Sequence, residues 1–235
     1  MLRKVVPLVI LSLGALLQTS PVPLRALSLE SAGLARVSIP ADGIPVLPLT
    51  QADFNGDSRL ETIRVTDGRA EILSGGQAAW QSPEAWTVLQ AEITDLNQDD
   101  TPELTLLVWR PFRPWPVDQW LPHGGRIDSF QDANGQSCHI ILIGWKRGAY
   151  RELWAGSAMA EPVRAFAAAD FNGDNHQELV TLEGTYAGSR SAAARSLKVW
   201  EWNGFGFTVV SEVKGTFSKM TLIQAGDGRI LILVP

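Results

Sequence analysis

The segment Ala52-Asp53-Phe54-Asn55-Gly56-Asp57 recurs letter for letter as Ala169-Asp170-Phe171-Asn172-Gly173-Asp174, and a looser copy, Asp95-Leu96-Asn97-Gln98-Asp99, lies between them. In each copy a glutamate stands four residues after the last aspartate and leads into an apolar run. Three copies with the same internal spacing indicate a structural repeat. A weaker fourth copy is Gly226-Asp227-Gly228, which also precedes an apolar run.

The spacing of the copies matches the length of a propeller blade. Asp53 and Asp95 are 42 residues apart, whereas Asp95 and Asp170 are 75 apart. The longer interval contains an odd segment, residues 110–137, which we interpret as an insertion. The underlying repeat is then roughly 42 to 57 residues, and repeats of about 40 to 50 residues with four strands each are typical of β-propeller blades.

Strand patterns support an all-β fold. Residues 61–66 and 69–74 flank Asp67-Gly68, which predicts a hairpin. Further strands are expected at residues 86–93, 138–145, 149–154, 163–169, 197–202, 207–213 and 216–224. We therefore predict one domain, residues 29–235, that forms a small β-propeller of about four blades. Three blades would each begin after one of the clear loops, and the fourth would join residues 229–234 to N-terminal strands within residues 34–49. Closing the ring in this way protects sheet edges.

The repeated motif, Asp-x-Asn-x-Asp-x-x-x-Glu, has the chemistry of a calcium loop. Its oxygen donors stand at positions 1, 3, 5 and 9, and a backbone carbonyl at position 7 can complete the set. Calcium accepts six to eight oxygen ligands in flexible geometry, whereas magnesium demands a stricter octahedron. The predicted side-chain ligands are Asp53, Asn55, Asp57 and Glu61; Asp95, Asn97, Asp99 and Glu103; and Asp170, Asn172, Asp174 and Glu178. The predicted carbonyl ligands are those of Arg59, Thr101 and His176.

A helical EF-hand begins with the same three ligands but needs glycine at position 6 and glutamate at position 12. Here position 6 is Ser58, Asp100 or Asn175, and position 12 is Arg64, Leu106 or Thr181. The flanking residues also alternate as strands do. The EF-hand and the related dockerin are therefore excluded. A plain turn rich in Asp, Asn and Gly, without metal, is the simpler alternative for any one copy. The glutamate shared by all three copies favours the metal site.

The pattern resembles the FG-GAP or VCBS repeat family, whose calcium-loop blades also build the propellers of integrin α-subunits. The resemblance rests on residues 53–61, 95–103 and 170–178, each of which enters an apolar strand. It implies a calcium-binding β-propeller exported to the cell surface or beyond, often serving adhesion or ligand binding. The chain departs from the family in having glutamate at the last ligand position and no recognisable Phe-Gly-Gly-Ala-Pro segment.

The insertion, residues 110–137, concentrates prolines, aromatic residues and arginines. Long loops are often functional, and aromatic residues and arginine dominate binding hot spots. We therefore take Phe112, Arg113, Trp115 and Trp120 as candidate ligand-binding residues. The alternative is a loop folded onto its own rim.

The N-terminus has the order of a secretory signal peptide: Arg3 and Lys4, an apolar run at residues 5–17, then a polar stretch with small residues at Ala26 and Ser28. The run is short for a membrane span, although a retained anchor is the alternative. We predict a signal peptide at residues 1–28. No cysteine lies near the predicted cut, which argues against a lipoprotein. The expected location is secreted, periplasmic or at the cell surface.

Composition and the absence of catalytic motifs exclude several classes of function. The chain has a formal net charge of −5, which argues against nucleic acid and anionic membranes as partners. Its single cysteine, Cys138, allows no internal disulfide and is expected to be buried. There is no Gly-x-Ser-x-Gly, His-Glu-x-x-His or phosphate loop. We therefore expect a non-catalytic module that binds a protein or carbohydrate at the cell surface, with structural calcium. The alternatives are a polysaccharide-active enzyme on a propeller scaffold and a structural subunit of a surface assembly.

Overall fold

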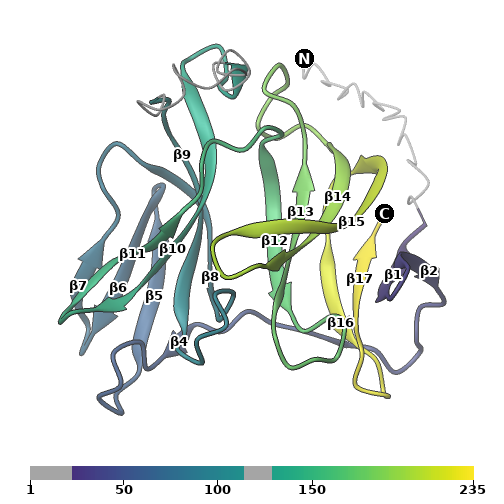
Figure 1. Ribbon diagram of the computed structural model, residues 1–235, viewed down its shortest axis with the longest axis horizontal. Helices are drawn as coiled ribbons and strands as arrows, with labels where there is room; N and C mark the ends of the chain where they lie inside the picture. The colour runs from purple at the N-terminus through teal and green to yellow at the C-terminus, as the bar shows by residue number, and fades with distance from the viewer. Residues whose placement is uncertain (1–22, 114–128) are drawn as a thin grey trace, which may run out of the picture.

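The computed structural model describes residues 23–113 and 129–235 (Figure 1). These residues form four antiparallel sheets arranged as a four-bladed β-propeller, with essentially no helix. The prediction of an all-β propeller of about four blades is confirmed. Within the same residues, no helix has the length and apolar character needed to cross a membrane.

Three sheets are continuous in the chain. The first contains β4 (Gln51–Ala52), β5 (Glu61–Thr66), β6 (Arg69–Ser74) and β7 (Gln77–Gln81). The second contains β8 (Thr87–Thr94), β9 (Glu103–Pro111), β10 (Gln136–Lys146) and β11 (Ala149–Ala155). The third contains β12 (Val163–Ala169), β13 (Glu178–Glu183), β14 (Ala194–Trp202) and β15 (Phe207–Phe217).

The fourth sheet joins the two ends of the described chain. Its order is β2-β1-β17-β16-β3, made of β1 (Arg25–Glu30), β2 (Gly33–Val37), β3 (Ile44–Pro45), β16 (Thr221–Gln224) and β17 (Ile230–Val234). The predicted combination of N-terminal and C-terminal strands is thus confirmed. The N-terminal strands, however, begin at Arg25, earlier than the predicted residues 34–49.

Two details of the predicted strand plan are wrong. Each sheet begins one strand before its acidic loop, because the strands on either side of the loop pair antiparallel as a hairpin, as β8 and β9 do. The predicted strand at residues 216–224 is divided: β15 continues to Phe217, which pairs with Ala194 of β14, and β16 starts only at Thr221 in the fourth sheet. The hairpin around Asp67-Gly68 is correct to the residue.

Strand β1 holds the fourth sheet together. It pairs with β17 from Arg25 to Leu27 and with β2 from Ala26 to Glu30. Ala26, Leu27 and Ser28 are buried. Most of the predicted signal peptide, residues 1–22, lies outside the described residues. A cleavage after Ser28 would remove more than half of β1 and separate β2 from β17.

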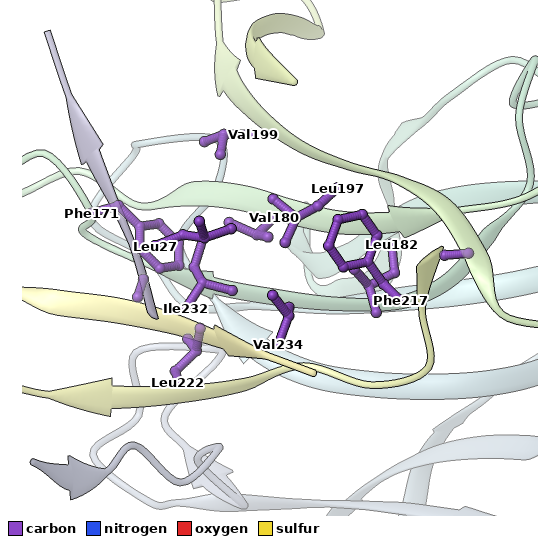
Figure 2. Close-up of a cluster of buried hydrophobic side chains, with 12 residues drawn as sticks. Leu27, Phe171, Val180, Leu182, Leu197, Val199, Phe217, Leu222, Ile232 and Val234 are labelled. Atoms are coloured by element: carbon purple, nitrogen blue, oxygen red, sulfur yellow. The ribbon is translucent and has the colours of Figure 1, made fainter. Parts of the chain in front are cut away.

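The hydrophobic core lies between neighbouring sheets. One cluster packs the first sheet against the second, one the second against the third, and one the third against the fourth. Figure 2 shows the last of these, in which Leu27 and Ile232 of the fourth sheet lie close to Val180 of the third. Because β9 faces a cluster on each side, it is buried from Glu103 to Trp109, and apart from Thr105 its residues 104–109 are all apolar rather than alternating.

The side-chain amide of Gln90 links the first strand of the second sheet, β8, to the first strand of the third sheet, β12. Gln90 on β8 donates to the carbonyl oxygen of Phe166 on β12 (2.7 Å) and accepts from its N–H (3.1 Å). The Glu92 carboxylate accepts from the Gln90 amide (2.6 Å) and from the backbone of Ala168. Burial raises the pKa of Glu92 to about 7, because the charged form loses its hydration.

Candidate metal-binding loops

The three acidic loops occupy the same place in three sheets. Loop 1 (residues 53–61) joins β4 to β5, loop 2 (residues 95–103) joins β8 to β9, and loop 3 (residues 170–178) joins β12 to β13. Each therefore connects the first strand of its sheet to the second. The weak fourth copy around Asp227 lies at the matching place, between β16 and β17. The repeat found in the sequence is thus a repeat of the structure.

The first aspartate organises each loop by accepting backbone N–H groups. Asp53 accepts from Gly56 (2.7 Å) and Ser58 (2.8 Å). Asp170 accepts in the same way from Gly173 (2.6 Å) and Asn175 (2.9 Å). Asp95 accepts from Asp99 and Asp100, at 3.1 Å each. An ionised carboxylate has about four acceptor sites, so these bonds leave capacity for a cation.

The residues at positions 3 and 5 tighten the turn further. In loop 3, Asn172 Oδ1 accepts from the N–H of Asp174 (2.8 Å), and Asp174 Oδ1 accepts from the N–H of His176 (2.8 Å). Loops 1 and 2 repeat both bonds. Position 6 adopts positive φ in every loop: Ser58 at 66°, Asp100 at 60° and Asn175 at 69°. Side-chain oxygens at alternate positions therefore face the coiled backbone and accept its N–H groups.

The glutamate at position 9 lies beneath the loop. Glu61, Glu103 and Glu178 are at most 1% exposed. Each accepts the N–H of the residue at position 2: Phe54 (3.0 Å), Leu96 (2.7 Å) and Phe171 (2.8 Å). The side chain of that residue is itself buried in an inter-sheet cluster. The glutamate thus couples the loop to the core, which is a second role that the sequence pattern did not reveal.

Burial makes two of these carboxylates hard to ionise. It raises the pKa of Glu103 to about 8 and that of Glu178 to about 7. Nearby aspartates of the same loop act in the same direction by charge repulsion. In loops 1 and 3 the glutamate oxygen that does not accept the N–H of position 2 accepts instead from an asparagine amide, that of Asn55 or Asn172 (3.0 Å each). In loop 2 the matching atom, Glu103 Oε2, is buried and has no hydrogen-bond partner.

The donor set fits a hard cation in its chemistry. Each loop brings carboxylate and amide oxygens to one coil, which are the ligands that Ca²⁺ prefers. An orphaned buried carboxylate oxygen such as Glu103 Oε2 is costly unless something compensates it. Within residues 23–113 and 129–235, however, no group of three or more His, Cys, Asp or Glu side chains is already arranged around a common metal position. The loops therefore offer the donor chemistry, while their first aspartates are engaged with backbone N–H groups.

One residue that sequence reasoning missed joins two loops. Gln177, at position 8 of loop 3, accepts the N–H of Asp95, the first residue of loop 2, at 2.8 Å. Loops 2 and 3 are therefore adjacent on one face of the propeller. The motif leaves position 8 unspecified, so nothing in the sequence pattern marked this contact.

The insertion extends from the ends of β9 and β10. Arg110 pairs with Ser137 and Pro111 with Gln136, so both boundaries of residues 110–137 lie on paired strands. Phe112 is half-buried and donates its N–H to Gly135 (2.8 Å), and Arg113 is exposed. The other two candidate residues, Trp115 and Trp120, lie outside the described residues.

A charged contact that the sequence did not suggest anchors the base of the insertion. Arg190, between β13 and β14, pairs with Asp132 (2.7 Å) and stacks 3.9 Å from the Trp109 ring centroid. The guanidinium thus ties the insertion to the third sheet.

The single cysteine, Cys138, is fully buried as predicted, and burial raises the pKa of its thiol to about 12. A thiol in that state is a poor nucleophile.

Comparison with protein-family models finds none that matches this chain, and comparison with curated proteins finds no match either.

Proposed function

We propose that this protein is an exported calcium-binding β-propeller of the FG-GAP or VCBS kind that works by binding rather than by catalysis. The observation that carries the proposal is the equivalence of the three loops. All three occupy the same connection in their sheets and keep the same oxygen donors, and in all three the first aspartate accepts the N–H of position 6 and the glutamate that of position 2. The donors at positions 3, 5 and 9 also bond backbone N–H groups, but a plain turn does not require one identical set of oxygen donors in three separate sheets, so this repetition supports a ligand.

Calcium has a structural role in this proposal. The aspartates, the asparagine and the buried glutamate of each loop would hold the cation. When bound, Ca²⁺ supplies positive charge that offsets repulsion among the carboxylates. The glutamate also bonds the N–H of a residue buried between sheets, so a cation held by the loop would stabilise the packing of that blade.

The proposed partner is a protein or carbohydrate at the cell surface, recognised by the insertion. Its base is fixed by strand pairing and by the ion pair between Arg190 and Asp132, which would present Phe112 and Arg113 on a rigid support. Pre-organisation reduces the entropy lost on binding. The acidic chain gives no basis for nucleic acid as a partner.

The N-terminal pattern supports export, and the position of β1 bears on where a signal peptide would be cut. A cut that leaves the fourth sheet whole must fall upstream of Arg25, because residues from Arg25 onward pair with β17. We therefore propose a signal peptide that ends before Arg25, earlier than the position suggested by the small residues alone.

Calcium titration tests the central claim. Purified protein, stripped with chelator and titrated with CaCl₂ in a calorimeter, should bind about three ions at dissociation constants near 10⁻⁴ to 10⁻³ M, the range of extracellular calcium modules. Magnesium at the same concentration should bind more weakly. An absence of measurable heat, together with identical melting curves in calcium and in EDTA, would refute the proposal.

A further inference from the structure

A pocket of about 440 Å³ lies between the second and third sheets, apart from the acidic loops. Its wall comes from β10, from β11 and the residues 156–160 that follow it, from β13, from β14 and β15 with the turn between them, and from Phe130. The β14–β15 hairpin reaches toward the second sheet (Figure 1), and Gly206 in its turn lies against the Trp154 ring. We call this site the aromatic pocket. Its volume is within the range of about 300 to 1,000 Å³ that is usual for small-molecule sites.

Aromatic rings dominate the wall. Phe130, Trp154, Trp200, Phe205 and Phe207 line it. Trp154 and Phe207 pack edge to face, with ring centroids 5.1 Å apart at 83°, and Trp202 packs edge to face against both. An aromatic ligand that joins such a cluster is stabilised by the contact between ring edge and ring face, in addition to the burial of its area.

The wall carries no charge. None of the described residues that line the aromatic pocket has an ionisable side chain. A charged group placed there would lose its hydration without an opposite charge to pair with, which is strongly unfavourable. The pocket therefore selects an uncharged ligand.

The polar atoms of the wall are largely engaged already. Trp200 donates its indole N–H to Thr181 (2.9 Å), and Asn203 accepts the N–H groups of Phe205 (3.0 Å) and Gly206 (2.9 Å). The Met159 N–H donates to Cys138 and the Met159 carbonyl accepts from Tyr186. A sugar needs hydrogen bonds to several hydroxyl groups, and among the polar side chains of the described wall only the Ser157 hydroxyl and the Trp154 indole N–H are left to make them. The wall therefore favours an apolar ring over a carbohydrate.

Phe205 presents an exposed aromatic ring at the pocket. It lines the pocket from the β14–β15 turn, yet 87% of its surface is exposed. The turn is held by Asn203, so it does not need this side chain for its shape. A ligand in the pocket would cover the exposed ring, which stabilises the complex by removing apolar surface from water.

We propose that the aromatic pocket binds a small, uncharged molecule that carries an aromatic ring. The site is separate from the calcium loops, and apart from Phe130 its wall lies outside the insertion. Binding there extends beyond the proposed calcium-dependent role and does not depend on it.

The test uses the neutral fluorescent probe N-phenyl-1-naphthylamine and the purified protein in 5 mM CaCl₂. Energy transfer from Trp154 and Trp200 to the probe should report saturable binding at one site. Phe205→Ala, a change at an exposed position, should weaken binding about tenfold or more, as expected for the loss of a ring covered on binding. Gly206→Leu places a side chain against Trp154 and should abolish binding.

Leu47→Ala is the matched control, because Leu47 is also highly exposed, at 78%, but does not line the pocket. It should leave the affinity unchanged, and melting curves should confirm that all variants are folded. The anionic analogue 1-anilinonaphthalene-8-sulfonate should bind more weakly than the neutral probe. The proposal is overturned if no saturable binding occurs, if Phe205→Ala binds like Leu47→Ala, or if the anionic analogue binds as tightly.

Discussion

Replacing Asp170 with alanine should destabilise the protein by two separable amounts, one without calcium and one with it. The carboxylate accepts N–H groups from Gly173 and Asn175, both of which have positive φ. Hydrogen bonds to charged groups each contribute up to about 3 kcal/mol when buried and less when exposed. These bonds are at an exposed loop, so we expect a loss of about 1–3 kcal/mol in EDTA.

The calcium-dependent part follows from mass action. A ligand that binds only the folded state adds RT ln(1 + [L]/Kd) to the free energy of unfolding. At 5 mM calcium and dissociation constants of 10⁻⁴ to 10⁻³ M, each loop gains about 1–2 kcal/mol. Asp170→Ala should remove this gain for loop 3, so its total effect should be larger in calcium than in EDTA by that amount.

Urea unfolding followed by tryptophan fluorescence, in 5 mM CaCl₂ and in EDTA, measures both parts. Asp227→Ala is the matched control, because Asp227 lies in the corresponding turn of the fourth sheet and accepts the N–H of Arg229, but lacks the other donors of the motif. Its effect should be the same in both buffers. If Asp170→Ala also has equal effects in both, then Asp170 shapes a turn and holds no cation.

The raised pKa of Glu92 means that the folded state binds its proton more tightly than the unfolded state, so stability falls as pH rises from about 4.5 to 7. Glu92→Gln should therefore be more stable than the wild type at pH 8, by at most about 3 kcal/mol, and nearly equal to it at pH 4.5. Urea unfolding curves that show no pH-dependent difference between the two proteins would contradict this. Changing Trp115 and Trp120 together to alanine should leave the calcium-dependent melting curve intact while reducing capture of a glycan or surface protein on an array, and a collapsed fold would instead place both rings in the core. Deleting residues 25–28 should cause loss of cooperative unfolding, because these residues pair with β17 and β2. Mass spectrometry of the exported protein should find an N-terminus at or upstream of Arg25. A mature protein that starts at Leu29 and melts cooperatively would disprove the role assigned to β1.

Local patterns predict the parts of the fold that depend on neighbours in the chain. The hairpin around Asp67-Gly68 and the strand at residues 163–169 are correct to the residue, because turn chemistry and alternation act over a few residues. The acidic loops are placed correctly for the same reason. Their first aspartates bond N–H groups three to five residues ahead.

Contacts between distant residues could not be predicted from these local patterns. The grouping of strands into sheets depends on which edges meet, and β1 pairs with β17 across almost the entire described chain. The second role of Glu61, Glu103 and Glu178 depends on the burial of position 2 between sheets, which no spacing rule states.

The class of fold, the number and chemistry of the acidic loops, and the place of the insertion can all be predicted from the chain alone, since each is encoded in residues close together in it. The contact of Trp154 with Phe207, the bond of Gln177 to the neighbouring loop and the ion pair of Arg190 with the insertion become visible only in the folded protein. These contacts join different sheets or connections, and their partners are chosen by how the sheets pack around the ring.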